Sequence, residues 1–181
     1  MDFTPNADHE AIREGVRRVC VDFDDDYWRR CDAEHEFPWD FYRAMAAGGW
    51  IGIAIPEEHG GGGRGITEAS LVVEEVAASG AAMNGASAIH LSIFGMGPVI
   101  HHGSPELQAR VLPRVASGDL HVAFGVTEPD AGTDTSRITS PASRALKSFG
   151  GCGRSWLTTP RSGRGSASSR ASTALLNTRS P

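Results

Sequence analysis

Residues 123–134, "AFGVTEPDAGTD", mark the point where the pattern of this sequence changes. Upstream, apolar side chains recur every three or four residues, as in helices, whereas Phe124 and Val126 alternate with small residues, as in a strand. A strand that ends at Thr127 and bends at the following Glu-Pro pair leaves backbone N–H groups free for a ligand. Gly132 lets a ligand approach the backbone closely. The stretch suits a heteroaromatic ring and a pyrophosphate, although most loops of this composition are ordinary turns.

The residues before this point carry the patterns of helices. Thr4-Pro5 is a typical helix cap followed by a first-turn proline, and Ser104-Pro105 repeats that signal near the end of the region. Gly48-Gly49 is a typical helix stop. We expect helices that start at residue 4 and continue through residue 23, then over residues 39–47, 66–79 and 83–101, and from residue 104 to about residue 115. Pro113 is expected to kink or shorten the last of them.

Two further expectations concern the segments between and along these helices. Ile51, Ile53 and Ile55 alternate before a proline, which predicts a short extended connector packed against the helices. The four glycines at 60–63 predict a flexible or tightly turned loop. The third helix is expected to place its three acidic residues on the face toward water. These residues are Glu68, Glu74 and Glu75.

The bulk composition narrows the class of protein. A hydrophobic fraction of 40% supports a real core, and a net charge of −5 argues against a nucleic-acid binder, which needs a basic surface. Three widely spaced cysteines predict neither a disulfide framework nor a zinc site, so a reducing cytoplasm is expected. The first residues lack the pattern of a secretion signal. Residues 81–100 are mostly apolar but contain Asn84 and His90, which favours a buried helix over a membrane span.

The charge is divided unevenly along the chain. Residues 1–138 hold ten basic and all 22 acidic residues, a net charge of −12, whereas residues 139–181 hold seven basic residues and no acid, a net charge of +7. This last segment is rich in Ser, Arg and Gly and has neither helical nor strand periodicity. We expect it to be disordered or translated out of frame after Ile138.

Three segments together resemble the acyl-CoA dehydrogenase family, flavoenzymes that oxidise acyl-CoA thioesters to 2-enoyl-CoA. "VTEPDAGTD" (126–134) resembles its signature loop, "FPWDFYRAMAAGGWIGIAIPEEHGGGG" (37–63) its helix and connector, and "GSPELQARVLPRVASGD" (103–119) its last N-terminal helix. The resemblance extends over residues 5–138. It implies a mainly α fold with an all-helical N-terminal domain at 1–119, the start of a β-rich central domain with the flavin loop at 120–138, and an atypical tail at 139–181.

The resemblance also implies the residues of an FAD site. Phe124, Val126 and Thr127 would meet the flavin ring, with Thr127 donating hydrogen bonds near N5, and Gly132 and Thr133 would lie at the pyrophosphate. The family's second flavin contact, in the central domain, resembles "SWLTT" (155–159), which adds Trp156 and Thr158.

The acyl-CoA substrate would contact three residues of the fourth helix together with Thr133. Family members line their acyl slot at the positions of Ser87, His90 and Phe94. His90 and Phe94 could equally be ordinary residues of a helical core. The sequence offers no catalytic residue and no metal site.

The family's catalytic base is a glutamate of a C-terminal helical domain, which the resemblance does not reach. We therefore expect a truncated member that lacks the base domain and is inactive alone. By family, its function would be FAD-dependent α,β-dehydrogenation in fatty acid β-oxidation and lipid metabolism, with electron-transferring flavoprotein as acceptor and a homo-oligomer as the assembled state. The alternatives are a non-catalytic helical interaction module or pseudo-enzyme fragment and, closer, an acyl-CoA oxidase or flavin monooxygenase of the same fold.

Overall fold

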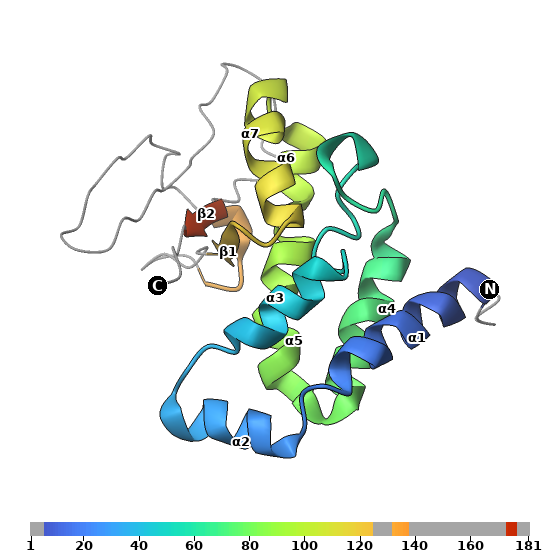
Figure 1. The fold of residues 1–181 in the computed structure, drawn as a ribbon. Coiled ribbons are helices and arrows are strands. Elements are labelled where there is room, and N and C mark those ends of the chain that lie inside the picture. The colour runs from blue at the N-terminus through green and yellow to red at the C-terminus, as the bar shows by residue number, and fades with distance from the viewer. Residues whose placement is uncertain (1–5, 125–131, 138–172, 177–181) are drawn as a thin grey trace.

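The computed structural model describes residues 6–124, 132–137 and 173–176. Most of them are helical, and Figure 1 shows the helices gathered into one bundle with the two strands at its side. The helices of the bundle are α1 (Ala7–Cys20), α2 (Asp25–Glu34), α3 (Trp39–Ala47), α4 (Ile66–Val76), α5 (Ala82–Phe94), α6 (Gly97–His102) and α7 (Pro105–Ala116). Shorter elements are the 3-10 turns η1 (Glu57–His59) and η3 (Thr135–Arg137), the π-helical segment η2 (Ala77–Ala81), and the strands β1 (His121–Phe124) and β2 (Thr173–Leu176).

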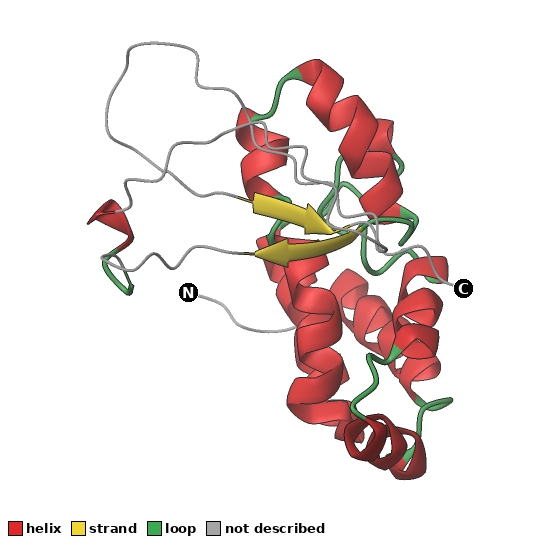
Figure 2. Ribbon diagram, turned by 90° about the vertical axis from the view of Figure 1, so that its left-hand side faces the viewer, coloured by secondary structure: helices red, strands yellow, loops and turns green. Residues whose placement is uncertain are grey.

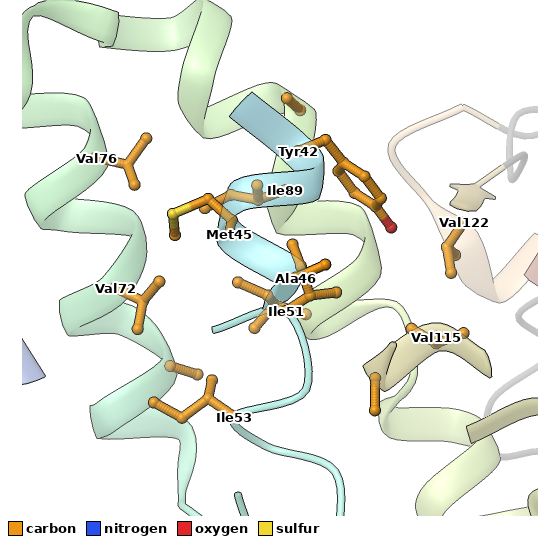
Figure 3. Close-up of a cluster of buried hydrophobic side chains, with 14 of the residues drawn as sticks. Tyr42, Met45, Ala46, Ile51, Ile53, Val72, Val76, Ile89, Val115 and Val122 are labelled. Carbon is orange, nitrogen blue, oxygen red and sulfur yellow. The ribbon is translucent and has the colours of Figure 1, made fainter. Parts of the chain in front are cut away.

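The core lies where α3, α4 and α5 meet. Figure 3 shows Val72 and Val76 of α4 facing Met45 of α3 and Ile89 of α5 across an apolar interior, with Ile51 below them. All five side chains are fully buried. Apolar residues at spacings of three and four put one face of each helix into this interior, which is why the sequence periodicity predicts helices correctly here.

The connector after α3 is turned rather than extended, so that prediction is wrong. Ile53 N donates to the carbonyl of Trp50 over 3.4 Å, and Ile55 N donates to that of Gly52 over 2.9 Å, as in successive turns. All three isoleucines are nevertheless buried, as expected.

The four glycines account for these turns. A Cβ atom on Gly61 would lie 2.1 Å from the carbonyl oxygen of Ile55, which only glycine avoids. The segment behind it forms hydrogen bonds with the connector, from Gly62 N to Gly52 O and from Gly63 N to Ile55 O. Of the two conformations expected for this loop, the structure has the tightly turned one.

Several helix ends differ from the sequence prediction. The first helix is capped by Asn6, whose side chain accepts a hydrogen bond from His9 N, rather than by Thr4. A helix that the periodicity missed, α2, follows its own cap at Asp24. The third predicted helix ends at Val76 and continues as the π-helical η2, in which Gly80 has a φ of 97°.

Glycine and proline affect the fourth and fifth predicted helices differently. The long helix predicted for residues 83–101 is divided into α5 and α6 at Gly95, where a Cβ would lie 2.3 Å from the carbonyl of Leu91. Ser104 caps α7 as predicted, accepting from Leu107 N. Pro113 does not shorten α7, which continues through it to Ala116.

The acidic face predicted for α4 is only partly correct. Glu74 is exposed, but the Glu75 side chain is 6% exposed and lies between two arginines of α1. It accepts hydrogen bonds from Arg13 and, at 2.7 and 3.0 Å, from Arg17. Burial raises the pKa of Glu75, but the bonds from the two guanidinium groups outweigh burial and hold the pKa below its usual value. This ion cluster joins α1 to α4.

The described strands form one antiparallel pair beside α5 (Figure 2). His121 is opposite Leu176 and Phe124 is opposite Thr173. The strand predicted from residue 121 is confirmed over β1, whereas the sequence predicts no strand where β2 occurs. The other residues of the tail lie outside the described residues, so its expected character stays a prediction. Among the described helices, none has the length and apolarity needed to cross a membrane.

Candidate functional site

Helix α5 has two faces with different properties. Ile89, Ser92 and Ile93 are buried against the core. Ser87 is exposed, His90 is half-buried and Phe94 is 36% exposed. Because residues three, four and seven apart lie on the same side of a helix, the three predicted substrate residues form one stripe. We call Ser87, His90 and Phe94 the α5 stripe.

His90 is held in one tautomer by its own helix. Its Nδ1 lies 3.3 Å from the carbonyl oxygens of Ala86 and of Ser87. A carbonyl oxygen only accepts hydrogen bonds, so Nδ1 carries the hydrogen and Nε2 is the acceptor of the neutral ring. Within the described part of the chain, neither Nε2 of His90 nor the Ser87 hydroxyl has a hydrogen-bond partner. Among the described residues, the stripe therefore carries hydrogen-bonding atoms that the protein itself does not use.

A buried hydrogen bond fixes the opposite face of α5. The hydroxyl groups of Tyr42 and Ser92 lie 3.0 Å apart, and both residues are fully buried. Burial raises the pKa of the Tyr42 phenol, with the Ser92 hydroxyl opposing that rise, so the phenol stays neutral. A buried hydroxyl without this partner would cost about 1–3 kcal/mol, so the pair holds α5 against α3 at one rotation. This rotation sets the direction in which the α5 stripe faces.

His121 attaches β1 to the helices. Its ring lies 4.7 Å from that of Phe37, 5.6 Å from that of Trp39 and 5.0 Å from that of Tyr42, measured between centroids. Burial lowers the pKa of His121, with a hydrogen bond to the Ala88 backbone opposing that effect. The neutral imidazole is thus packed among three aromatic rings, and β1 is anchored beside α5 at its first residue.

The next residue of β1 reaches the C-terminal end of α5. A Cβ atom on Gly95 would lie 3.3 Å from Cγ1 of Val122, and Gly95 directly follows Phe94. The strand that leads toward residues 126–134 therefore packs against α5 at Gly95, the residue that follows Phe94. The helix that carries the predicted substrate residues thus lies beside the strand that starts the predicted flavin segment.

The described part of the flavin loop is open to solvent. Gly132 and Thr133 are exposed, and a Cβ atom on Gly132 would meet no described atom within 4 Å. Asp134 then accepts a hydrogen bond of 3.2 Å from Ser136 N, which closes the turn into η3. A backbone with free space beside it fits the close approach that a pyrophosphate requires. Gly132 and Thr133 are thus compatible with the role expected of them in holding FAD.

The remaining predicted cofactor residues are placed only in part. Phe124 is the last residue of β1. Val126, Thr127, Trp156 and Thr158 lie outside the described residues, so their roles stay predictions. Within the described ranges, no three His, Cys, Asp or Glu side chains gather where they could hold a metal ion.

Sequence reasoning misses the residues that support the site. Tyr42 and Ser92 are separated by 50 positions, and no local pattern connects them. The strand pattern from residue 121 gives His121 no role beyond starting the strand. A weak signal exists, because "FPWDFY" at 37–42 gathers four aromatic residues within six positions, which is unusual for a helix start.

Comparison with known proteins identifies relatives of most of this chain. Residues 6–119 match the family model described as "Acyl-CoA dehydrogenase, N-terminal domain". Acyl-CoA dehydrogenase FadE12 of Mycobacterium tuberculosis is 33% identical over 148 residues, covering 78% of this chain and 36% of the relative.

Solved structures agree with the sequence relatives. The glutaryl-coenzyme A dehydrogenase complex with glutaryl-CoA is 29% identical, with a TM-score of 0.65, and the match covers 78% of this chain and 36% of that one. A structure described as the electron transferring flavoprotein of Acidaminococcus fermentans is also 29% identical, with a TM-score of 0.69, and covers 78% and 37%. The chain thus spans about a third of the length of the relatives it matches, and the expected mainly α fold is confirmed.

Proposed function

Because this chain belongs to the acyl-CoA dehydrogenase family, we propose that it serves FAD-dependent α,β-dehydrogenation of acyl-CoA thioesters. The observation that carries the proposal is the packing of β1 against α5, since it puts the helix that carries the predicted substrate residues next to the strand that leads into the predicted flavin loop. The relatives, which include acyl-CoA and glutaryl-CoA dehydrogenases, support the same function.

FAD, when bound, supplies the acceptor for a hydride from the acyl chain. In the proposal, Phe124, Val126 and Thr127 hold its ring, Gly132 and Thr133 hold its pyrophosphate, and Trp156 with Thr158 contributes a second ring contact. Thr133 also lies near the thioester. The α5 stripe orients the acyl chain and separates it from water on one side.

The scaffold residues determine where these groups are held. The Tyr42–Ser92 bond fixes the rotation of α5, and His121 among its three aromatic neighbours fixes the start of β1. Reacting groups must be held within fractions of an ångström, so rigid elements under the stripe and the strand serve the chemistry directly.

The wider setting of the activity is proposed on the family alone. It comprises fatty acid β-oxidation in the cytoplasm, electron-transferring flavoprotein as the acceptor, and assembly into a homo-oligomer. A reducing compartment agrees with the free, buried thiols of Cys20 and Cys31. The glutamate base of the family is proposed to lie on a domain outside these 181 residues.

A titration with FAD tests the proposal. We expect the purified chain to bind FAD saturably in equilibrium dialysis, and Thr127→Val to weaken binding by about tenfold because a donor to the ring is lost. Thr67→Val, a change at an exposed position of α4, is the matched control and is expected to bind normally.

The same preparation separates the competing functions. A chain that binds neither FAD nor an acyl-CoA would indicate a helical interaction module and would contradict the proposal. After chemical reduction of the bound flavin, rapid reoxidation by oxygen in place of electron transfer to a dye would indicate an oxidase or monooxygenase.

A further inference from the structure

The helical bundle holds β1 firmly on one side. The Val122 side chain is fully buried, and the His121 ring packs among three aromatic rings. The backbone N–H and C=O groups of a strand still need partners along its edges. β1 is therefore a fixed template whose edge can accept a second strand.

The strand that occupies this edge comes from the far end of the sequence. β1 and β2 pair antiparallel over their full length, with Val122 opposite Leu175 and Ala123 opposite Ala174 (Figure 2). Among the described elements, β1 also packs against α5, whereas β2 contacts β1 far more than any other element. Two short strands are marginally stable by themselves, and this pairing must also offset the entropy of bringing together the two ends of residues 125–172. β2 is therefore the more easily detached of the two strands.

The charge of the chain favours the return of a detached β2 segment to β1. Residues 139–181 hold seven basic residues and no acid, whereas residues 1–138 have a net charge of −12. Opposite charges attract each other over about 10 Å at 0.1 M salt. A second copy of the chain carries the same charges, so its β2 segment is attracted to this β1 as well.

We propose that the edge of β1 is an exchangeable strand-addition site, which β2 of the same chain occupies here and which β2 of a second copy can occupy instead. Main-chain hydrogen bonds supply the affinity, as when an extended peptide is added to the edge of a sheet. The connection through residues 125–172 gives β2 an effective concentration of at most about a millimolar. Exchange between copies therefore increases as the protein concentration approaches that value. The inference does not depend on the proposed function.

A labelled peptide tests the site in the full-length chain. The probe is RASTALLNTR, residues 170–179, and its binding is followed by fluorescence anisotropy. Ala174→Pro with Leu175→Pro opens the edge, because neighbouring strand residues point their N–H groups to opposite sides and one of the two prolines must remove a bond to β1. We expect this double variant to bind the peptide at least about fivefold more tightly than the unaltered chain, in which β2 competes for the edge.

Two controls separate strand pairing from other effects. Ala167→Pro with Ser168→Pro places two prolines in the same basic segment but outside β2, and this variant should bind the peptide like the unaltered chain. A scrambled peptide of the same composition has the same charge and should bind more weakly. Circular dichroism checks that both variants keep their helices. Equal binding of the two peptides, or equal binding by the β2 variant and the unaltered chain, would overturn the inference.

The unaltered chain provides a measurement that needs no variant. Light scattering should show a share of dimers that grows as the chain approaches about 1 mM, and an excess of the peptide should dissociate them. A chain that stays monomeric over this range would overturn the exchange between copies. Dimers that the peptide leaves intact would also overturn it, but they would agree with the assembly proposed from the family.

Discussion

The helical residues 6–119 and the segment that begins with β1 differ in what holds them in place. Each helix of the first region buries side chains in a shared core, and an ion cluster and a buried hydroxyl pair join helices that are distant in sequence. In the second region, residues 132, 133, 134, 136 and 137 are exposed, and their hydrogen bonds are local. The scaffold is stabilised by its own contacts, whereas the segment assigned to the cofactor has surface left for one.

The largest effect should come from closing the space at Gly61. Gly61→Ala puts a Cβ within 2.1 Å of Ile55 O and 2.6 Å of Gly52 O, so the connector must open. We expect a loss of about 4 kcal/mol in the free energy of unfolding, measured by urea denaturation. Gly97→Ala is the control, since its Cβ would meet no described atom within 4 Å, and should change stability by less than about 1 kcal/mol. Equal losses in the two variants would contradict the tight turn.

The next effect concerns the buried ion cluster. Glu75→Gln keeps the shape of the side chain but removes the buried negative charge between Arg13 and Arg17, at a cost of about 3 kcal/mol, although Arg13 keeps its ion pair with the exposed Glu74. Glu74→Gln changes an adjacent, exposed carboxylate and should cost less than about 0.5 kcal/mol. Thermal unfolding of both variants compares them directly. Similar melting temperatures would mean that α1 and α4 are held by apolar contacts alone.

The junction of the two regions should depend on pH through His121. Its pKa in the folded chain lies below the ordinary value of 6.5, so the unfolded chain binds the proton more readily. The stabilisation is complete above about pH 6.5 and is lost as the pH falls below that value. His121→Phe keeps the ring contacts and should flatten this part of the stability profile, with a smaller effect than either scaffold variant. An unchanged profile would mean that His121 does not anchor β1.

The smallest effect on stability should occur in the cofactor segment. Gly132→Val adds a side chain where no described atom lies within 4 Å, so the free energy of unfolding should change by less than about 0.5 kcal/mol. The same side chain would occupy the space proposed for the pyrophosphate, and FAD affinity should fall at least tenfold. Gly97→Val, which alters the scaffold surface, should leave FAD affinity unchanged. A destabilised Gly132→Val protein would contradict the division between the regions.

Local signals predict the elements that local contacts determine. Residues 39–47 end at a glycine pair, and α3 has these bounds. The Ser104 cap is visible in the sequence because its partner, Leu107, is three residues away. The alternating isoleucines predict a strand, because their period is two. The connector instead turns back against Gly61, six residues beyond the last isoleucine, where only glycine fits.

Long-range contacts account for what the sequence does not reveal. The helical pattern alone predicts that Glu75 faces water. Its arginine partners cannot be seen in a local pattern, because they lie 58 and 62 positions earlier. The positions of the α5 stripe follow from a family resemblance and the helical period, but the tautomer of His90 requires the distances to Ala86 and Ser87. The support of the stripe by Tyr42 is likewise a tertiary feature.

Hydrogen–deuterium exchange with and without saturating FAD tests the central claim most directly. If the segment from Phe124 to Asp134 binds the cofactor, its backbone amides should exchange more slowly with FAD, while those of α3 and α4 should keep their rates. The claim would be contradicted if FAD slowed exchange only within the helices. It would also be contradicted if exchange changed nowhere at FAD concentrations that saturate acyl-CoA dehydrogenases.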